Sequence, residues 1–142
     1  MSVVWGVVLV VLSLLAWGGQ TISWLAPSRA TRLGLVEAED DVEAVYWADI
    51  RGEAAWDAAT LWTMAVAGVL LIADHSWWPY FGLVGGGMYL YFSGRGILTR
   101  LALQRRGFRI GAAGNVQAGY ALLGVWGAMA AITIGAAAAA LS

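Results

Sequence analysis

Long charge-free stretches alternate with short charged connections along this chain of 142 residues. Residues 1–28 and 110–142 carry no charged side chain, and residues 58–73 form a third such run. A fourth apolar run begins near Tyr80 and continues past Arg95. A helix of about 20 apolar residues crosses the hydrocarbon core of a bilayer. The pattern therefore predicts four membrane spans, at about 3–25, 54–73, 78–103 and 116–139.

The connections between these runs contain residues that end helices or mark turns. Pro27 ends the first span because its ring cannot continue the backbone hydrogen bonds of a helix. Residues 74–79 read Asp-His-Ser-Trp-Trp-Pro, which predicts a tight turn with aromatic anchors. Apolar residues recur at roughly helical spacing between the first two spans: Leu35, Val42, Val45, Tyr46 and Ile50. They predict an interfacial helix over about 36–51, followed by a bend at Gly52.

Composition indicates an integral membrane protein. Hydrophobic residues make up 61% of the chain and charged residues only 12%, whereas soluble domains carry about 25% charged residues. The net charge of −1 gives no global field for nucleic acid, so the expected partner is the lipid bilayer. We expect one all-α domain over residues 1–142, a four-helix membrane bundle with an additional acidic interfacial helix between spans one and two.

The arginines predict the orientation of the spans. Three lie between spans one and two (Arg29, Arg32 and Arg51), three follow span three (Arg105, Arg106 and Arg109), and the 74–79 turn has none. Cytoplasmic loops are enriched in positive charge, so we expect the acidic tract in the cytoplasm and both termini outside. Arg without any Lys, together with abundant Gly and Ala, suits a GC-rich genome. The location that we expect is a bacterial inner membrane.

Four charged residues fall within the hairpin of spans two and three. Because a tight turn joins these spans, residues whose numbers sum to about 152–153 should lie at equal depth, which places Asp57 opposite Arg95 and Glu53 opposite Arg100. An isolated charge in hydrocarbon costs roughly 2.5–3.5 kcal/mol or more. We therefore predict a buried network of these four residues with an Asp57–Arg95 pair. The network either fixes helix register or forms an ion, proton or anionic-ligand site at the cytoplasmic mouth.

Eight of the nine acidic residues lie between positions 37 and 57. The densest part is Glu39, Asp40, Asp41 and Glu43, which predicts a solvated acidic surface or, alternatively, a surface for a partner or a cation. The tract lacks the spacing and the glycine of an EF-hand loop. We expect no metal site.

The chain offers no complete set of catalytic or cofactor-binding residues. The absence of Cys excludes disulfides, iron–sulfur ligation by thiolates and c-type haem attachment. His75 is the only His, which excludes bis-His haem within one subunit. Asp74, His75 and Ser76 are adjacent and cannot easily align as a catalytic triad. We expect no catalytic residue and no cofactor.

Small and aromatic residues suggest how the helices pack. Gly82 and Gly86 have the spacing that lets a neighbouring backbone approach a helix closely. Such faces favour packing within the chain, with a homo-oligomer or a larger membrane complex as the alternative. Aromatic residues of span three could line a pocket for a lipid-like or quinone-like molecule, although packing is the simpler role: Tyr80, Phe81, Tyr89, Tyr91 and Phe92.

The layout resembles that of DoxX-like four-helix membrane proteins. The similarity rests on Pro27 closing span one, Asp49-Ile50-Arg51-Gly52 at the start of span two, and Gly94-Arg95-Gly96 late in span three. The resemblance implies a compact four-helix bundle with an accessory role beside a respiratory or redox complex, and it transfers no catalytic residue.

Three functions remain open from the sequence. The first is a non-enzymatic accessory or assembly subunit that docks a partner through its acidic cytoplasmic face. The second is a small ion- or proton-coupled transporter or channel that uses Asp57 and Glu53 with Arg95 and Arg100. The third is a membrane enzyme that binds a lipid or a quinone, which requires a pocket with Glu53 or Asp57 on its wall.

Overall fold

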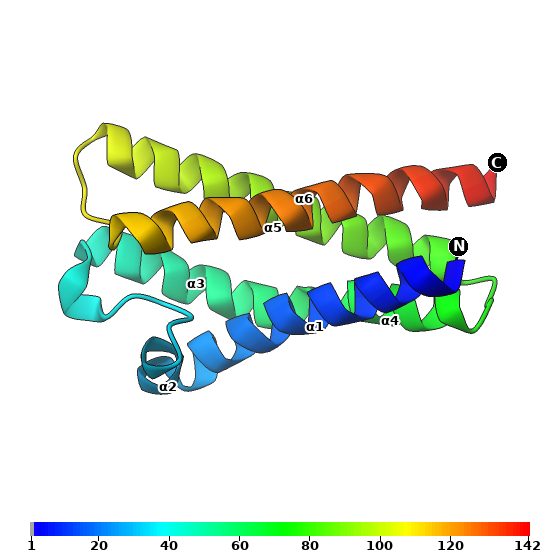
Figure 1. Ribbon diagram of the computed structural model, residues 1–142, viewed down its shortest axis with the longest axis horizontal. Coiled ribbons are helices and arrows are strands. Elements are labelled where there is room, and N and C mark those ends of the chain that lie inside the picture. Colours follow the sequence, from blue (N-terminus) through cyan, green and yellow to red (C-terminus); the bar gives the residue numbers. More distant parts are fainter. Residues whose placement is uncertain (1) are drawn as a thin grey trace.

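The computed structural model describes residues 2–142, and this part of the chain is helical without any strand. The helices are α1 (Ser2–Leu25), α2 (Pro27–Arg32), the 3-10 turn η1 (Glu39–Asp41), α3 (Ala44–Thr60), α4 (Trp62–Ile72), α5 (Trp78–Arg105) and α6 (Ala113–Leu141). α3 and α4 follow one another as one long rod. This rod packs against α1 and α5, and α5 packs against α6, so that all four run along the length of the bundle (Figure 1).

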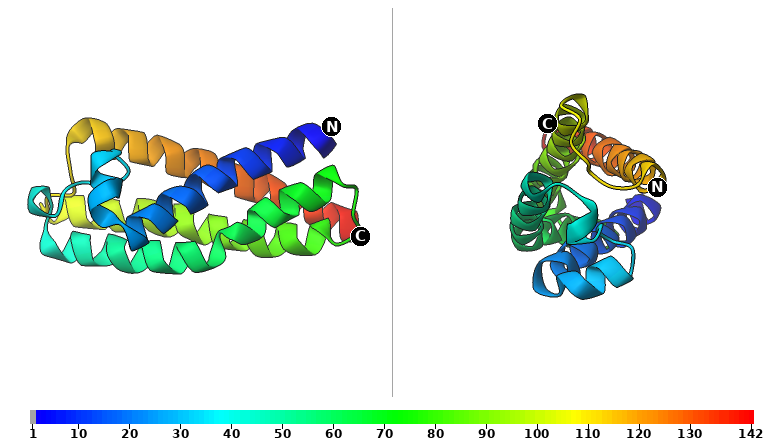
Figure 2. Two further views of the ribbon diagram at one scale, coloured as in Figure 1. Left: turned by 90° about the horizontal axis from the view of Figure 1, so that it is seen from below. Right: turned by 90° about the vertical axis from the view of Figure 1, so that its left-hand side faces the viewer.

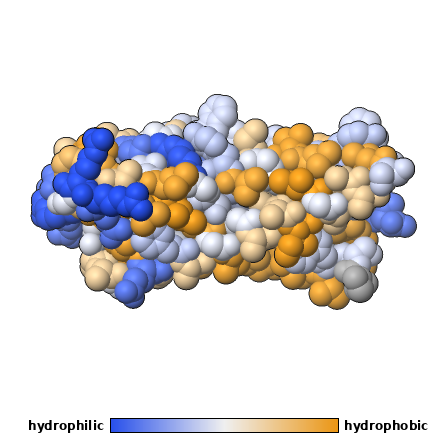
Figure 3. Space-filling view, turned by 90° about the horizontal axis from the view of Figure 1, so that it is seen from above, coloured by the Kyte–Doolittle hydropathy of each residue, from blue (hydrophilic) through white to orange (hydrophobic). Residues whose placement is uncertain are grey.

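The two ends of the bundle differ in polarity. The chain termini and the turn between α4 and α5 lie at one end, whereas α2, η1 and the α5–α6 connection lie at the other (Figure 1). Hydrophilic residues gather at this second end in the space-filling view, and apolar residues cover much of the remaining length (Figure 3). We call the second end the polar end.

Three helices are long and apolar enough to cross a membrane, namely Ser2–Leu25, Ala44–Ile72 and Ala113–Leu141. Their outward faces expose large apolar side chains, among them Val4, Leu15, Val69 and Ile132. A soluble monomer rarely exposes apolar surface on this scale, so these faces fit a lipid environment. α5 is equally long but carries Arg95, Arg100 and Arg105 in its second half, and it does not meet the same criterion.

Small residues bring α1 close to α4 and α5 close to α6. A Cβ atom at Gly68 of α4 would lie 2.8 Å from the carbonyl oxygen of Gly6 in α1. A Cβ atom at Gly82 would lie 3.2 Å from Cβ of Ala137, and one at Gly86 would lie 2.5 Å from Cγ1 of Ile134, so both glycines of α5 face α6. Side chains from all four rods form the core between them: Leu9, Leu61, Met64, Tyr89, Phe92, Leu123 and Met129.

The rod of α3 and α4 is interrupted at Leu61. Side chains occupy the carbonyl oxygens next to the interruption: Trp17 Nε1 donates to Ala58 at 2.8 Å, Trp62 Nε1 to Ala59 at 2.9 Å, and Thr63 Oγ1 to Thr60 at 2.8 Å. Backbone carbonyls without partners are costly in lipid. These indole and hydroxyl donors therefore stabilise the break, and it lies at Leu61 rather than at the predicted position, Gly52.

The separate interfacial helix predicted over 36–51 is wrong. Residues 33–43 form an irregular connection around η1, and residues from Ala44 onward belong to α3, so this helix starts about ten residues before the predicted span. The reason is tertiary. Val42 packs with Ile110 and Val116, and the backbone N–H of Glu43 donates to the carbonyl of Arg109 at 2.9 Å. This segment therefore pairs with the α5–α6 connection instead of forming its own helix.

Replacement of Gly85 by Ala should destabilise the bundle, because the new Cβ would lie 2.8 Å from the backbone N and Cα of Met64 in α4. Forced overpacking of this kind costs about 1–3 kcal/mol. Gly87→Ala is the matched control, since its Cβ would meet no atom within 4 Å. Thermal unfolding in detergent micelles should show a lower midpoint for Gly85→Ala only. Equal midpoints for the two variants would contradict the close α4–α5 approach.

Candidate functional site

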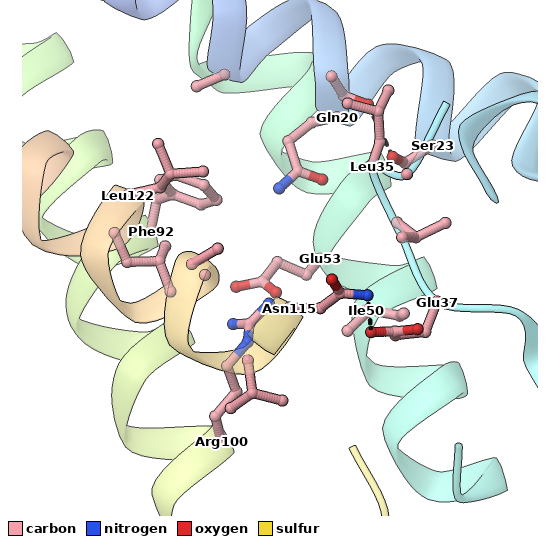
Figure 4. Close-up of a pocket in the computed structure, with 18 of the residues that line it drawn as sticks. Gln20, Ser23, Leu35, Glu37, Ile50, Glu53, Phe92, Arg100, Asn115 and Leu122 are labelled. Carbon is pink, nitrogen blue, oxygen red and sulfur yellow. Dashed lines mark hydrogen bonds between the residues drawn. The ribbon is translucent and has the colours of Figure 1, made fainter. Parts of the chain in front are cut away.

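A cavity of about 290 Å³ lies inside the polar half of the bundle. Its walls come from α1, residues 34–37, α3, α5 and α6 (Figure 4). Polar groups line the part nearer the polar end, and apolar groups line the part farther from it. The polar lining is Gln20, Ser23, Glu37, Tyr46, Glu53, Arg100 and Asn115, and the apolar lining includes Leu15, Phe92, Leu122, Leu123 and Trp126.

The cavity opens between α1 and α6. Leu15 of α1 and Leu122 of α6 line it and are nevertheless 63% and 52% exposed, so they form its outer rim. Deeper in the bundle, the indole of Trp126 donates to the carbonyl of Leu12 at 2.9 Å and joins α6 to α1. The opening thus faces the apolar side of the bundle, where lipid chains would lie.

Arg95 joins α5 to α3 through two carboxylates. Its Nη2 donates a hydrogen bond to Oδ1 of Asp49. Its Nη1 lies 2.9 Å from Oε1 of Glu53, where the two groups form an ion pair but are not aligned for a hydrogen bond. The side chain of Glu53 is only 7% exposed. Arg presents a planar set of donors that can serve two carboxylates together.

The predicted Asp57–Arg95 pair is wrong by about one helical turn. Gly85 lies against Met64, so facing residues have numbers that sum to about 149 rather than 152–153. This register places Arg95 next to Glu53, and its long side chain also reaches Asp49. The sequence-based count took 74–79 as the turn, whereas α4 ends at Ile72 and α5 begins at Trp78, so the helices already face each other with a sum of about 150 at the turn.

Asp57 is buried without a visible partner. It is 1% exposed, and its Oδ2 has no hydrogen bond within residues 2–142. The nearby hydroxyl of Tyr89 donates to the carbonyl of Ser13 at 2.9 Å. In the same part of the chain, no group of three His, Cys, Asp or Glu side chains could hold a metal ion.

Arg100 faces the cavity and forms no ion pair with the carboxylates of the described residues, including its predicted partner Glu53. Its Nη1 donates to the carbonyl of Gly96 at 2.9 Å, and its guanidinium carbon lies 5.8 Å from the centre of the Tyr46 ring. The carboxylate of Glu53 and the guanidinium of Arg100 converge on the same part of the cavity from α3 and α5 (Figure 4).

The polar end is held together by short-range polar contacts. Glu37 accepts a hydrogen bond from Asn115 Nδ2 at 2.8 Å and lies against Gly111, whose φ of +123° suits glycine. Arg51 donates to the carbonyls of Ser23 and Trp24 at the end of α1, where positive charge is favourable. These contacts fix the segments around the mouth of the cavity.

The predicted acidic surface is divided in the structure. Glu39, Asp40 and Asp41 are exposed in η1, whereas Glu43 lies 3.5 Å from Arg109 as an ion pair. The tract therefore offers three exposed carboxylates rather than four, next to the arginines of the α5–α6 connection.

Sequence reasoning did not identify Asp49, Gln20 and Asn115 as site residues. Asp49 lies four residues before Glu53, so the two share a helix face, and this spacing could have signalled it. Gln20 is a polar residue within an otherwise charge-free span. The position of Asn115 beside Glu37 had no signal in the sequence, because the contact joins segments far apart in the chain.

Comparison with protein-family models finds no match, and comparisons with curated proteins and with solved structures find none either. The fold and the site define the class: a helical membrane protein with an amphiphilic cavity in its polar half. The resemblance to DoxX-like proteins stays a prediction.

Arg95→Gln should destabilise the protein much more than Asp57→Asn. Loss of Arg95 leaves Asp49 and Glu53 unpaired, which should cost roughly 2–4 kcal/mol, less than for a fully buried pair because the Arg95 side chain is 28% exposed. Asp57→Asn removes a charge that has no ion-pair partner, so its stability should stay within about 1 kcal/mol of wild type or rise. Thermal unfolding in one detergent measures both. Equal losses would instead support the Asp57–Arg95 pair.

Proposed function

We propose that this protein is a four-span, non-enzymatic membrane protein that binds an amphiphilic molecule entering sideways from the lipid phase. The observation that carries the proposal is the cavity, whose rim of Leu15 and Leu122 faces the apolar surface while Glu53 and Arg100 line its inner wall. Protein interiors are normally packed without large voids. A void that is apolar at depth and polar near the membrane surface matches a molecule with a head and a tail.

The membrane topology supports this orientation. In this proposal α5 is the fourth span, because its three arginines all lie toward the polar end. Arg95 is paired there, and the long side chains of the other two arginines reach the headgroup region. The arginine-bearing connections share that end (Figure 1), and positive-inside reasoning assigns it to the cytoplasm. The head of a bound amphiphile would then lie in the cytoplasmic leaflet.

The size of the cavity fits part of a lipid rather than all of it. Binding pockets for small molecules usually have about 300–1,000 Å³, and this cavity has about 290 Å³. It accommodates a headgroup and the first part of a chain. The remaining chain would lie in the bilayer past the rim residues.

The other two functions have less support. Ion transport would use the charges of Asp57, Glu53, Arg95 and Arg100, but Arg95 is held between Asp49 and Glu53. The carbonyl groups at the broken helix, which could otherwise bind an ion, already accept hydrogen bonds from side chains. Docking of a partner has the exposed acids of η1 behind it, and one of the expected four acids is paired with Arg109. The cavity, by contrast, offers an amphiphile enough volume, a lining that is polar at one end and apolar at the other, and an opening toward the apolar surface.

Gly119→Leu should abolish the stabilisation of the protein by added lipid. Gly119 lines the cavity, and a side chain there would fill it, since the Cβ position is 4.0 Å from Arg100 Nε. A ligand at 100 times its Kd stabilises a protein by about 2.7 kcal/mol. Delipidated wild-type protein should therefore unfold at a higher temperature when phospholipid is added, and Gly119→Leu should not.

Gly124→Leu provides the control for this measurement. It places the same side chain on the same helix at a position that meets no atom within 4 Å and does not line the cavity. This variant should respond to lipid as wild type does. If wild type gains no stability from lipid, or both variants gain equally, the proposed binding function is wrong.

A further inference from the structure

Two opposite charges face the same space in the cavity without touching each other. The carboxylate of Glu53 and the guanidinium of Arg100 converge there (Figure 4), yet they form no ion pair. The free donors of Arg100 point to a bound acceptor, and the carboxylate of Glu53 points to a bound donor. The carboxylate of Glu53 is paired with Arg95 through Oε1 only, and the guanidinium of Arg100 has no carboxylate partner within the described residues. Incompletely paired charges in a membrane-embedded cavity are costly, so the site is completed by a ligand that supplies a donor to Glu53 and an acceptor to Arg100.

The overall charge of the wall disfavours a ligand with net negative charge. Glu53 and Arg100 line the cavity, and with Asp49 and Arg95, which pair behind Glu53, they contribute two charges of each sign. Glu37 adds a further carboxylate to the wall, and its hydrogen bond from Asn115 does not neutralise it. A net anion would meet an excess of one negative charge, whereas a zwitterion leaves the balance unchanged.

The polar groups of the cavity lie at the depth that a lipid headgroup can reach. Gln20 lies five residues before the end of α1 at Leu25, and Arg100 lies five residues before the end of α5 at Arg105. At 1.5 Å per residue this depth is roughly 8 Å from the helix ends. A phospholipid of the same leaflet reaches this level from the side, through the opening between α1 and α6.

We propose that the cavity binds a zwitterionic phospholipid with a primary ammonium group, of the phosphatidylethanolamine type. Arg100 donates to the phosphate oxygens, the ammonium donates to the carboxylate of Glu53, and the acyl chains leave past Leu15 and Leu122. This inference rests on the proposed amphiphile-binding function and adds the chemistry of the headgroup. A choline headgroup lacks N–H donors, so it cannot make the hydrogen bond to Glu53.

The test is a competition among three phospholipids. Protein is reconstituted in vesicles with equal amounts of dioleoyl lipids bearing ethanolamine, choline or glycerol headgroups and is then extracted in mild detergent. Native mass spectrometry counts the retained lipids. A hydrogen bond to a charged group contributes about 1.5–3 kcal/mol, so the ethanolamine lipid should exceed each of the other two by about tenfold. Soluble phosphoethanolamine in excess should not displace it, because the chains contribute to binding.

Variants separate the headgroup inference from the binding function. Glu53→Gln removes the charge that holds the ammonium, leaves Arg95 paired with Asp49, and should lose the tenfold preference. Arg100→Gln removes the phosphate contact that all three lipids share, so it should lower the retention of all three and keep the preference, whereas Arg105→Gln at the exposed end of α5 should change neither. If Gly119→Leu removes the retained lipid but wild type retains all three headgroups equally, or Glu53→Gln keeps the preference, the headgroup inference is wrong and the function stands. If Gly119→Leu retains lipid as wild type does, the proposed function fails as well.

Discussion

The contact of Arg95 with Asp49 and Glu53 is the interaction on which the charged half of the bundle depends. Because one guanidinium serves two acids of α3, α5 is held in register against that helix in a medium where single charges are expensive. The same contact determines what remains unpaired. Asp57 is left inside the core, and Arg100 is left facing the cavity.

The distribution of small residues explains why the cavity lies between α1 and α6. Glycines allow close approach of α1 to α4 at Gly68, of α4 to α5 at Gly85 and of α5 to α6 at Gly86. Gly18, Gly19 and Gly124 of α1 and α6 instead face open space within residues 2–142. Three sides of the bundle are therefore tight. The fourth lies between α1 and α6, which run at an angle to one another (Figure 2), and there the indole of Trp126 joins the two helices beside the cavity.

Much of the helix pattern followed from hydrophobic runs, and the predicted boundaries at residues 3, 25, 78 and 103 lie within a few residues of the observed helix ends. The interfacial helix could not be predicted correctly, because Val42 and Glu43 make their contacts with the α5–α6 connection rather than with their own neighbours. The Asp57–Arg95 pair could not be predicted correctly either. Counting from the turn requires the exact helix ends, and the close approach of Gly85 to Met64 sets the register of α4 and α5.

The sequence by itself determined that this chain is helical and suited to lipid, because long charge-free runs leave the backbone no other way to satisfy its hydrogen bonds in hydrocarbon. It also determined that the few charges gather toward one end. The tertiary structure alone decided which charges meet and where space remains. Those outcomes depend on how each helix is rotated and on its register against its neighbours. A shift of α5 by one turn against α3 would give Arg95 another partner and would change whether Glu53 lines the cavity.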